Sequence, residues 1–135
     1  MKKFFAVAAL IVGIFVAQVS SVQAYDPYEN DANFAYVYSG HGGTMYLDLN
    51  SVNVQTYDPP YYQIAGTFVF QPGSNASVRE TYVEMRFNYS TKETFERDGG
   101  QWRLKDVRGD SNVSSRNRAM ANALFRAAYR MNFYN

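Results

Sequence analysis

The sequence contains no cysteine, a single histidine at position 41, and no lysine or arginine between residues 25 and 78. Without cysteine there is no disulfide, no cysteine nucleophile, no thiolate-bound metal and no lipid anchor on a cysteine. A serine–histidine–aspartate triad would depend on His41, which lies in the glycine-rich run 39–43, whereas a catalytic base needs a rigid support. We therefore predict that the protein is not an enzyme and binds neither a cofactor nor a metal ion.

Residues 1–24 have the pattern of a cleavable secretory signal peptide. Two lysines precede an apolar stretch from Phe4 to Val16, and Val22 and Ala24 are the small side chains before the cleavage point. The apolar stretch is shorter than the roughly 18–20 residues of a membrane-spanning helix, which disfavours an uncleaved anchor. We expect one exported domain, residues 25–135, with no transmembrane anchor after cleavage, in the periplasm, at the cell surface or secreted.

The charged residues are unevenly distributed along this domain. Removal of the two N-terminal lysines leaves eleven basic residues against twelve acidic ones, a net charge of −1. Residues 25–78 contain five acidic residues and no basic one, whereas residues 103–135 contain seven basic residues. We favour the interpretation that the two halves attract each other within one fold, with two surfaces for different partners as the alternative. The near-neutral total disfavours a nucleic-acid-binding protein.

The hydrophobic pattern predicts an antiparallel sheet followed by one helix. Segments rich in β-branched and aromatic residues, separated by turn residues, are expected to be strands at 34–38, 44–49, 52–57, 62–70, 78–89, 91–97 and 101–106. In the clearest of them, Val83, Met85 and Phe87 alternate with Glu84 and Arg86, as in a strand with one wet face. The segment 52–57 either continues the preceding strand or forms a short strand of its own.

From Val113 onward the apolar residues recur at helical spacing. Asp110, Ser111 and Asn112 are candidate N-caps. The expected apolar stripe consists of Met120, Leu124, Ala127, Ala128 and Met131, and a second aromatic line consists of Phe125, Tyr129 and Phe133. The predicted fold class is α+β: an antiparallel β-meander of about five to seven strands with one C-terminal α-helix packed on a face.

Carboxylate pairs and one tripeptide motif are further candidate functional sites. The glutamates of the strands alternate with basic residues, which is typical of cross-strand charge pairing rather than of a glycosidase. A carboxylate-based hydrolase using Glu84 or Asp48 is therefore the least favoured hypothesis. Residues 108–110 spell Arg-Gly-Asp, a tripeptide known for integrin recognition, but Gly109 is expected to turn the chain and Asp110 to start the helix.

Aromatic residues are abundant, and all twelve tyrosines lie in residues 25–135. Tyrosine suits both half-buried strands and binding surfaces. We predict a binding or interaction module and name as candidate ligand-binding residues Tyr82, Trp102, Arg116, Arg126 and Arg130. The three arginines are expected to contact any anionic ligand. The alternative hypothesis is a structural or assembly protein that forms a homodimer through its sheet edges.

Four segments resemble a known family: Tyr36–Tyr38, Met45–Val52, Glu80–Tyr89 and Phe95–Trp102. Across residues 34–106 their pattern is similar to the surface-adhesin protein E-like family of small exported bacterial proteins. The resemblance implies an antiparallel sheet with a helix and a role at the cell envelope, with a protein or glycan ligand there or in the host matrix. The chain departs from the family in lacking a lipid-anchor cysteine and any disulfide.

Overall fold

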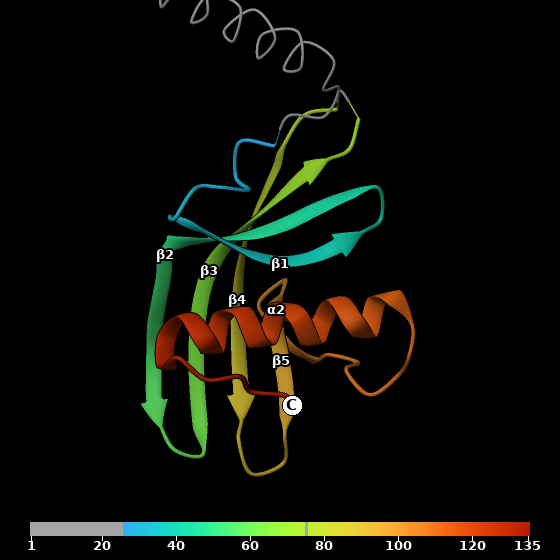
Figure 1. Ribbon diagram of the computed structural model, residues 1–135. Coiled ribbons are helices and arrows are strands. Elements are labelled where there is room, and N and C mark those ends of the chain that lie inside the picture. The colour runs from blue at the N-terminus through green and yellow to red at the C-terminus, as the bar shows by residue number, and fades with distance from the viewer. Residues whose placement is uncertain (1–25, 75) are drawn as a thin grey trace, which may run out of the picture.

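The computed structural model describes residues 26–74 and 76–135, so the predicted signal peptide lies outside the described residues. The described chain forms a six-stranded sheet followed by a helix (Figure 1). The elements are β1 (Phe34–Gly40), β2 (Gly43–Asp58), β3 (Tyr61–Pro72), β4 (Arg79–Asn88), β5 (Glu93–Asp98), β6 (Gln101–Leu104) and α2 (Asn112–Tyr129). Every neighbouring pair is antiparallel and the strand order follows the sequence, which confirms the predicted α+β meander.

The segment 52–57 continues the preceding strand, so β2 is one long strand with an irregularity inside it. Its pairing with β3 shifts between Asp48 and Asn53. Ser51 supports this bulge, because its hydroxyl donates to the Asp48 carbonyl at 2.6 Å and accepts from the Thr67 amide at 2.7 Å. Bulges bend strands. Figure 1 shows the result, because the first part of β2 runs across the view and the second part runs down it.

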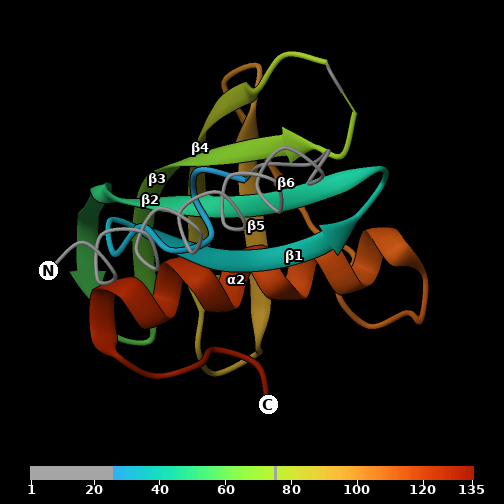
Figure 2. The same ribbon diagram turned by 45° about the horizontal axis from the view of Figure 1, so that its top comes forward.

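The core lies between the sheet and α2. Side chains of β2, β3 and β4 meet the helix there, and Leu47, Ile64, Met85 and Leu124 are fully buried. Gly66 on β3 lets α2 pack close to the sheet, because a Cβ added to it would lie 2.9 Å from Leu124 Cδ2. Figure 2 shows α2 running alongside β1 as a second layer.

The apolar stripe of the helix was predicted correctly only in part. Met120 and Leu124 are buried, but Ala127 is exposed and Met131 is 47 % exposed beyond the helix end. The aromatic line contacts the sheet instead, with Phe125 and Phe133 both 2 % exposed. The physical reason is the C-cap: residue 130 adopts a left-handed conformation, so the chain reverses and brings residues 131–135 back along the helix (Figures 1 and 2).

We call residues 130–135 the C-terminal clasp, because side chains from two elements hold them. Asn122 of α2 accepts a hydrogen bond from the Tyr134 amide at 2.7 Å and donates to the Tyr134 carbonyl at 3.2 Å. The Tyr134 hydroxyl donates to the Lys92 carbonyl at 3.1 Å and shares a hydrogen bond of 2.6 Å with the Thr94 hydroxyl. The clasp therefore fastens the end of the chain to both the helix and β5.

Candidate functional site

The sheet face opposite α2 exposes aromatic and charged side chains on β4, β5 and β6. The register pairs Arg97 with Trp102, and its continuation places Glu84 opposite Arg97. Residues two apart along a strand point to the same face, so Tyr82 and Arg86 join this row. We call this surface the outer-face patch; its members are Tyr82, Glu84, Arg86, Arg97, Trp102 and Leu104.

Two arginine side chains of the patch lie near the Trp102 ring. The guanidinium carbon of Arg86 lies 4.2 Å from the centroid of the Trp102 ring, and that of Arg97 lies 6.0 Å from it. Both distances are within the range of cation–π attraction. The arginines therefore orient the indole ring and leave it only half-buried, while the sheet backbone fixes its position.

Glu84 is held by three neighbours on the same face. Its carboxylate pairs with Arg97 at 3.5 Å and accepts hydrogen bonds from Tyr82 at 3.5 Å and from Gln55 of β2 at 3.4 Å. Its side chain is 20 % exposed. The contact of Glu84 with Arg97 is the predicted cross-strand charge pairing. The Glu84 carboxylate therefore already has hydrogen-bond partners within the protein.

Another part of the same face is covered by the chain itself. Residues 26–33 lie over β1 and β2, where the Tyr28 ring is 5.6 Å from the Tyr46 ring and the Tyr46 hydroxyl donates to Asp26. Tyr46 is only 4 % exposed, whereas Tyr82 is 60 % and Leu104 is 59 % exposed. Residues 26–33 are therefore packed against this part of the sheet. On β4 and β6 no such segment of the described chain covers the face, although Tyr36 of β1 is also 59 % exposed.

The structure brings two of the predicted ligand-binding residues onto one surface and places the other three elsewhere. Tyr82 and Trp102 belong to the outer-face patch. Arg116 is on the opposite side of the sheet, in the first half of α2, and ten residues of helix separate it from Arg126 by about 15 Å. Arg126 donates to the Asn132 side chain at 2.8 Å, and Arg130 is the exposed C-cap. The three arginines therefore do not form a single cluster.

Sequence reasoning missed Arg86 and Arg97 as members of the site. The signal was present, because both residues alternate with the buried residues of their strands and thus share the wet face with Tyr82. What the sequence did not provide was the strand register that sets Arg97 opposite Trp102.

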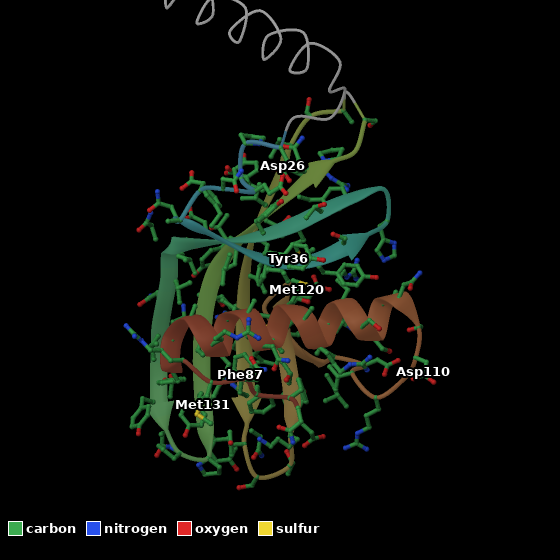
Figure 3. The ribbon with its side chains drawn as sticks, viewed as in Figure 1. Asp26, Tyr36, Phe87, Asp110, Met120 and Met131 are labelled. Carbon is green, nitrogen blue, oxygen red and sulfur yellow. The ribbon has the colours of Figure 1, made fainter. Side chains whose placement is uncertain are left out.

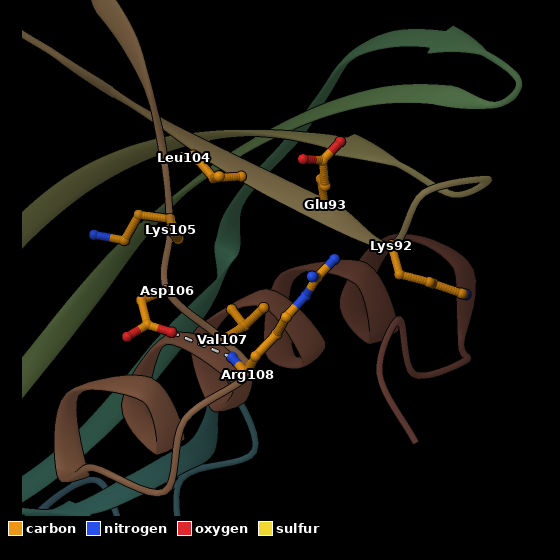
Figure 4. A pocket seen from close by; sticks show the side chains of 7 residues that line it. All are labelled: Lys92, Glu93, Leu104, Lys105, Asp106, Val107 and Arg108. Carbon is orange, nitrogen blue, oxygen red and sulfur yellow. Dashed lines mark hydrogen bonds between the residues drawn. The ribbon is translucent and has the colours of Figure 1, made fainter.

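A separate hollow of about 310 Å³ lies where β6 leads toward α2 (Figure 4). It includes Arg108 of the Arg-Gly-Asp tripeptide. Its lysines are engaged, because Lys105 pairs with Glu96 at 2.7 Å and Lys92 donates to the Phe133 carbonyl at 3.2 Å. Arg118 of α2 donates a hydrogen bond to the Gly109 carbonyl at 2.9 Å. The tripeptide forms the turn that precedes the helix, as expected, but Ser111 rather than Asp110 is the N-cap.

No protein-family model, curated protein or solved structure matches this chain. In residues 26–74 and 76–135, α2 falls short of the apolar length that a membrane crossing requires. The protein is a sheet with two different faces. One face presents an aromatic and cationic surface, and the only described helix packs on the other.

Proposed function

We propose that this chain is an exported, non-enzymatic binding module of the bacterial cell envelope, and that the outer-face patch is its contact surface for a protein partner. The observation that carries the proposal is the exposed Tyr82 beside a half-buried Trp102 flanked by two arginines. Tryptophan, tyrosine and arginine are the residue types that dominate binding energy at protein interfaces. The resemblance to the surface-adhesin protein E-like family supports an envelope location and a role in adhesion.

Two arginines of the patch are restrained before a partner arrives. Arg97 pairs with Glu84, and Arg86 lies against the indole ring, so part of their side-chain freedom is already restricted. Preorganisation reduces the entropic cost of association. The exposed Leu104 adds apolar area, and the guanidinium groups favour a partner with acidic side chains beside apolar ones.

A binding screen with patch variants tests the proposal. The purified protein is passed over immobilised matrix proteins and cell-wall glycans, and binding is measured by surface plasmon resonance. We expect saturable binding to a protein, and Trp102→Ala should weaken it by about 30-fold or more, the size of a hot-spot loss. Trp102→Phe should retain most of the affinity.

The matched control is Tyr57→Ala, which removes an exposed tyrosine that packs near α2 rather than on the patch. Equal losses for Tyr57→Ala and Trp102→Ala, or no saturable binding to any protein, would contradict the proposal. Saturable binding to a glycan alone would replace the protein partner by a carbohydrate one. Thermal unfolding of each variant verifies that the fold is intact.

The location is tested on intact source cells. Protease is applied from outside, and the released and retained fractions are analysed by mass spectrometry. We expect the mature chain to begin at residue 25 and to be cleaved from outside. Protection until the envelope is opened would instead assign a periplasmic role and remove adhesion from the proposal.

The alternative of a homodimer formed through sheet edges has less support from the structure. The edge strand β6 has only four residues, and the register of the other edge strand, β1, shifts between Tyr36 and Tyr38. Short or irregular edges resist pairing with a second sheet. Light scattering that shows a concentration-dependent dimer would favour this alternative.

The hydrolase hypothesis also has less support, because the Glu84 carboxylate is bound by Arg97, Tyr82 and Gln55. The Asp48 carboxylate accepts from the Asn50 amide at 3.0 Å, which is a local turn contact. A hydrolytic activity that is lost in Glu84→Gln or in Asp48→Asn would revive it.

A further inference from the structure

A cleft separates the first half of α2 from the sheet, on the opposite side of the molecule from the outer-face patch. It consists of two adjoining cavities of about 160 and 180 Å³. The residues that line both cavities are Met45, Phe70, Arg79, Thr81 and Arg116. We call this space the helix–sheet cleft. Figure 3 shows Met120, which also lines it, on the side of α2 that faces the sheet.

Two polar atoms beside the cleft lack hydrogen-bond partners among the described residues. They are Nε of Arg116 and Oδ1 of Asn117, and both atoms are buried. Asn117 is 3 % exposed, and its Nδ2 donates to the Asp106 carbonyl at 2.9 Å, which sets the amide orientation and leaves Oδ1 as the free end. Buried polar groups in native proteins are normally satisfied. One unpaired donor, Arg116 Nε, and one unpaired acceptor, Asn117 Oδ1, therefore belong to residues that line the same cavity.

The cleft is positively charged. In the described part of the chain, neither Arg79 nor Arg116 has a carboxylate within ion-pair distance. Glu96 also lines the cleft, but its carboxylate pairs with Lys105 at 2.7 Å, so these two charges offset each other. The guanidinium of Arg79 lies 4.8 Å from the centroid of the Phe70 ring, at the junction of the apolar and charged parts. The two arginines are thus available to an anion.

Apolar side chains form one part of the walls of the cleft. Phe68, Val83 and Met120 line the same cavity as Phe70 and Met45. A dry apolar cavity of about 150 Å³ holds one benzene molecule, so a cavity of about 160 Å³ accepts an apolar body the size of one aromatic ring. The helix–sheet cleft therefore combines an apolar space of defined size with two free cations and an unpaired acceptor.

We propose that the helix–sheet cleft binds a small amphipathic carboxylate that carries a hydroxyl group. Its carboxylate accepts hydrogen bonds from the guanidinium groups of Arg79 and Arg116, its hydroxyl donates to Asn117 Oδ1, and its ring-sized apolar body packs between Phe70 and Met120. Charge-assisted contacts of guanidinium with carboxylate are among the strong hydrogen bonds in proteins. This site is independent of the proposed binding function, because the outer-face patch contributes no residue to it.

Methionine-methyl NMR reads the cleft directly. In protein labelled with ¹³C at the methionine methyls, Met45 and Met120 line the cleft, whereas Met131 lies at the far end of α2 (Figure 3). The probe is 3-phenyllactate. We expect ring-current shifts at Met45 and Met120 that saturate with concentration, and no comparable shift at Met131.

Two matched probes test the chemical class. Removal of the hydroxyl, as in 3-phenylpropanoate, should weaken binding by several-fold because Asn117 Oδ1 stays unpaired. Replacement of the carboxylate, as in 3-phenylpropane-1,2-diol, should weaken it by tenfold or more. Equal binding of the diol and 3-phenyllactate would overturn the assignment of an anionic ligand. The absence of saturable shifts with 3-phenyllactate at millimolar concentration would overturn the site itself.

Charge-removing variants locate the ligand. Arg116→Gln and Arg79→Gln should each raise the Kd for 3-phenyllactate about tenfold. Arg126→Gln, which removes an exposed arginine about 15 Å along the helix from Arg116, should leave the Kd unchanged. Unchanged Kd values in both cleft variants would overturn the proposal. The methyl spectrum without ligand verifies the fold of each variant. If one variant fails to fold, the other variant and the three probes with the wild-type protein still test the proposal.

Discussion

Replacing Tyr134 by phenylalanine removes one oxygen from the C-terminal clasp, and it should lower the free energy of unfolding by about 1–3 kcal/mol. That oxygen serves Thr94 at 2.6 Å and the Lys92 carbonyl at 3.1 Å. The Thr94 side chain is fully buried, so its hydroxyl would find no water in the variant. The phenylalanine ring still fills the space, so the loss reports the hydrogen bonds rather than a cavity.

The assay is urea unfolding followed by the fluorescence of Trp102, with thermal unfolding beside it. In a domain of this size each kcal/mol corresponds to a shift of the melting temperature by roughly 4 °C. Thr94→Val removes the other hydroxyl and serves as the second arm of a double-mutant cycle. Because the two hydroxyls share one bond, the double variant should be clearly more stable than the sum of the single losses predicts. Strict additivity, or a loss below about 0.3 kcal/mol for Tyr134→Phe, would refute this reasoning.

Three further predictions concern stability. Gly66→Ala should destabilise the fold by about 1–3 kcal/mol in urea unfolding, because the new Cβ would lie 2.9 Å from the buried Leu124 Cδ2; an unchanged midpoint would show that the helix shifts freely. Ser111→Ala should lose about 1 kcal/mol, because the Ser111 side chain caps α2 by accepting from the Ser114 amide, and Ser111→Asp should retain it. Burial, together with the hydrogen bond to Asp26, raises the pKa of Tyr46 above its ordinary value of 10.0. The unfolded chain then loses this proton first, so the contribution of Tyr46 to stability should be fully present below pH about 10 and be lost above it. Stability should therefore fall less steeply above pH about 10 in Tyr46→Phe, and equal slopes in urea titrations across that range would contradict this assignment.

Local periodicity explains why so much of the fold was predictable. The strand boundaries of the structure agree with the predicted ones within two residues, and α2 begins at Asn112, beside the predicted cap. In β4 the alternation of Val83, Met85 and Phe87 with polar residues identified the buried face correctly. These features depend on neighbours in the sequence, which a pattern records directly.

The ends of the domain were harder to predict because their contacts are not local. Tyr134 is held by Thr94 and Asn122, forty and twelve residues away, and no periodicity links these positions. The chain reversal that makes the clasp occurs at Arg130 with φ = 59°, whereas such caps are usually glycine or asparagine. The sequence therefore carries no signal that the helix stops there, and Met131 was assigned to its stripe.

In the candidate site, too, the sequence predicted individual residues but not which distant residues lie beside them. Tyr82 and Trp102 were found by residue type, but their arginine neighbours required the register of β5 with β6. Arg116 was identified as a ligand contact, whereas Arg79, its partner in the helix–sheet cleft, comes from the start of β4. Composition thus selected residue types correctly, and only the fold decides which of them share a surface.

The charge distribution separates the two interpretations that the sequence left open. The ion pairs of the described residues join Glu84 with Arg97, Asp98 with Arg103, and Glu96 with Lys105, and all three lie between residues 84 and 105. None joins the acidic first half to the basic second half, so ion pairing is not how these halves are held together. Asp26 and Glu29 instead border an open hollow on β1 and β2. The arginines of the patch and the cleft lie on β4, β5 and α2, so the acidic residues around that hollow form a surface apart from them. That arrangement fits a protein with distinct contact surfaces better than a fold that neutralises itself.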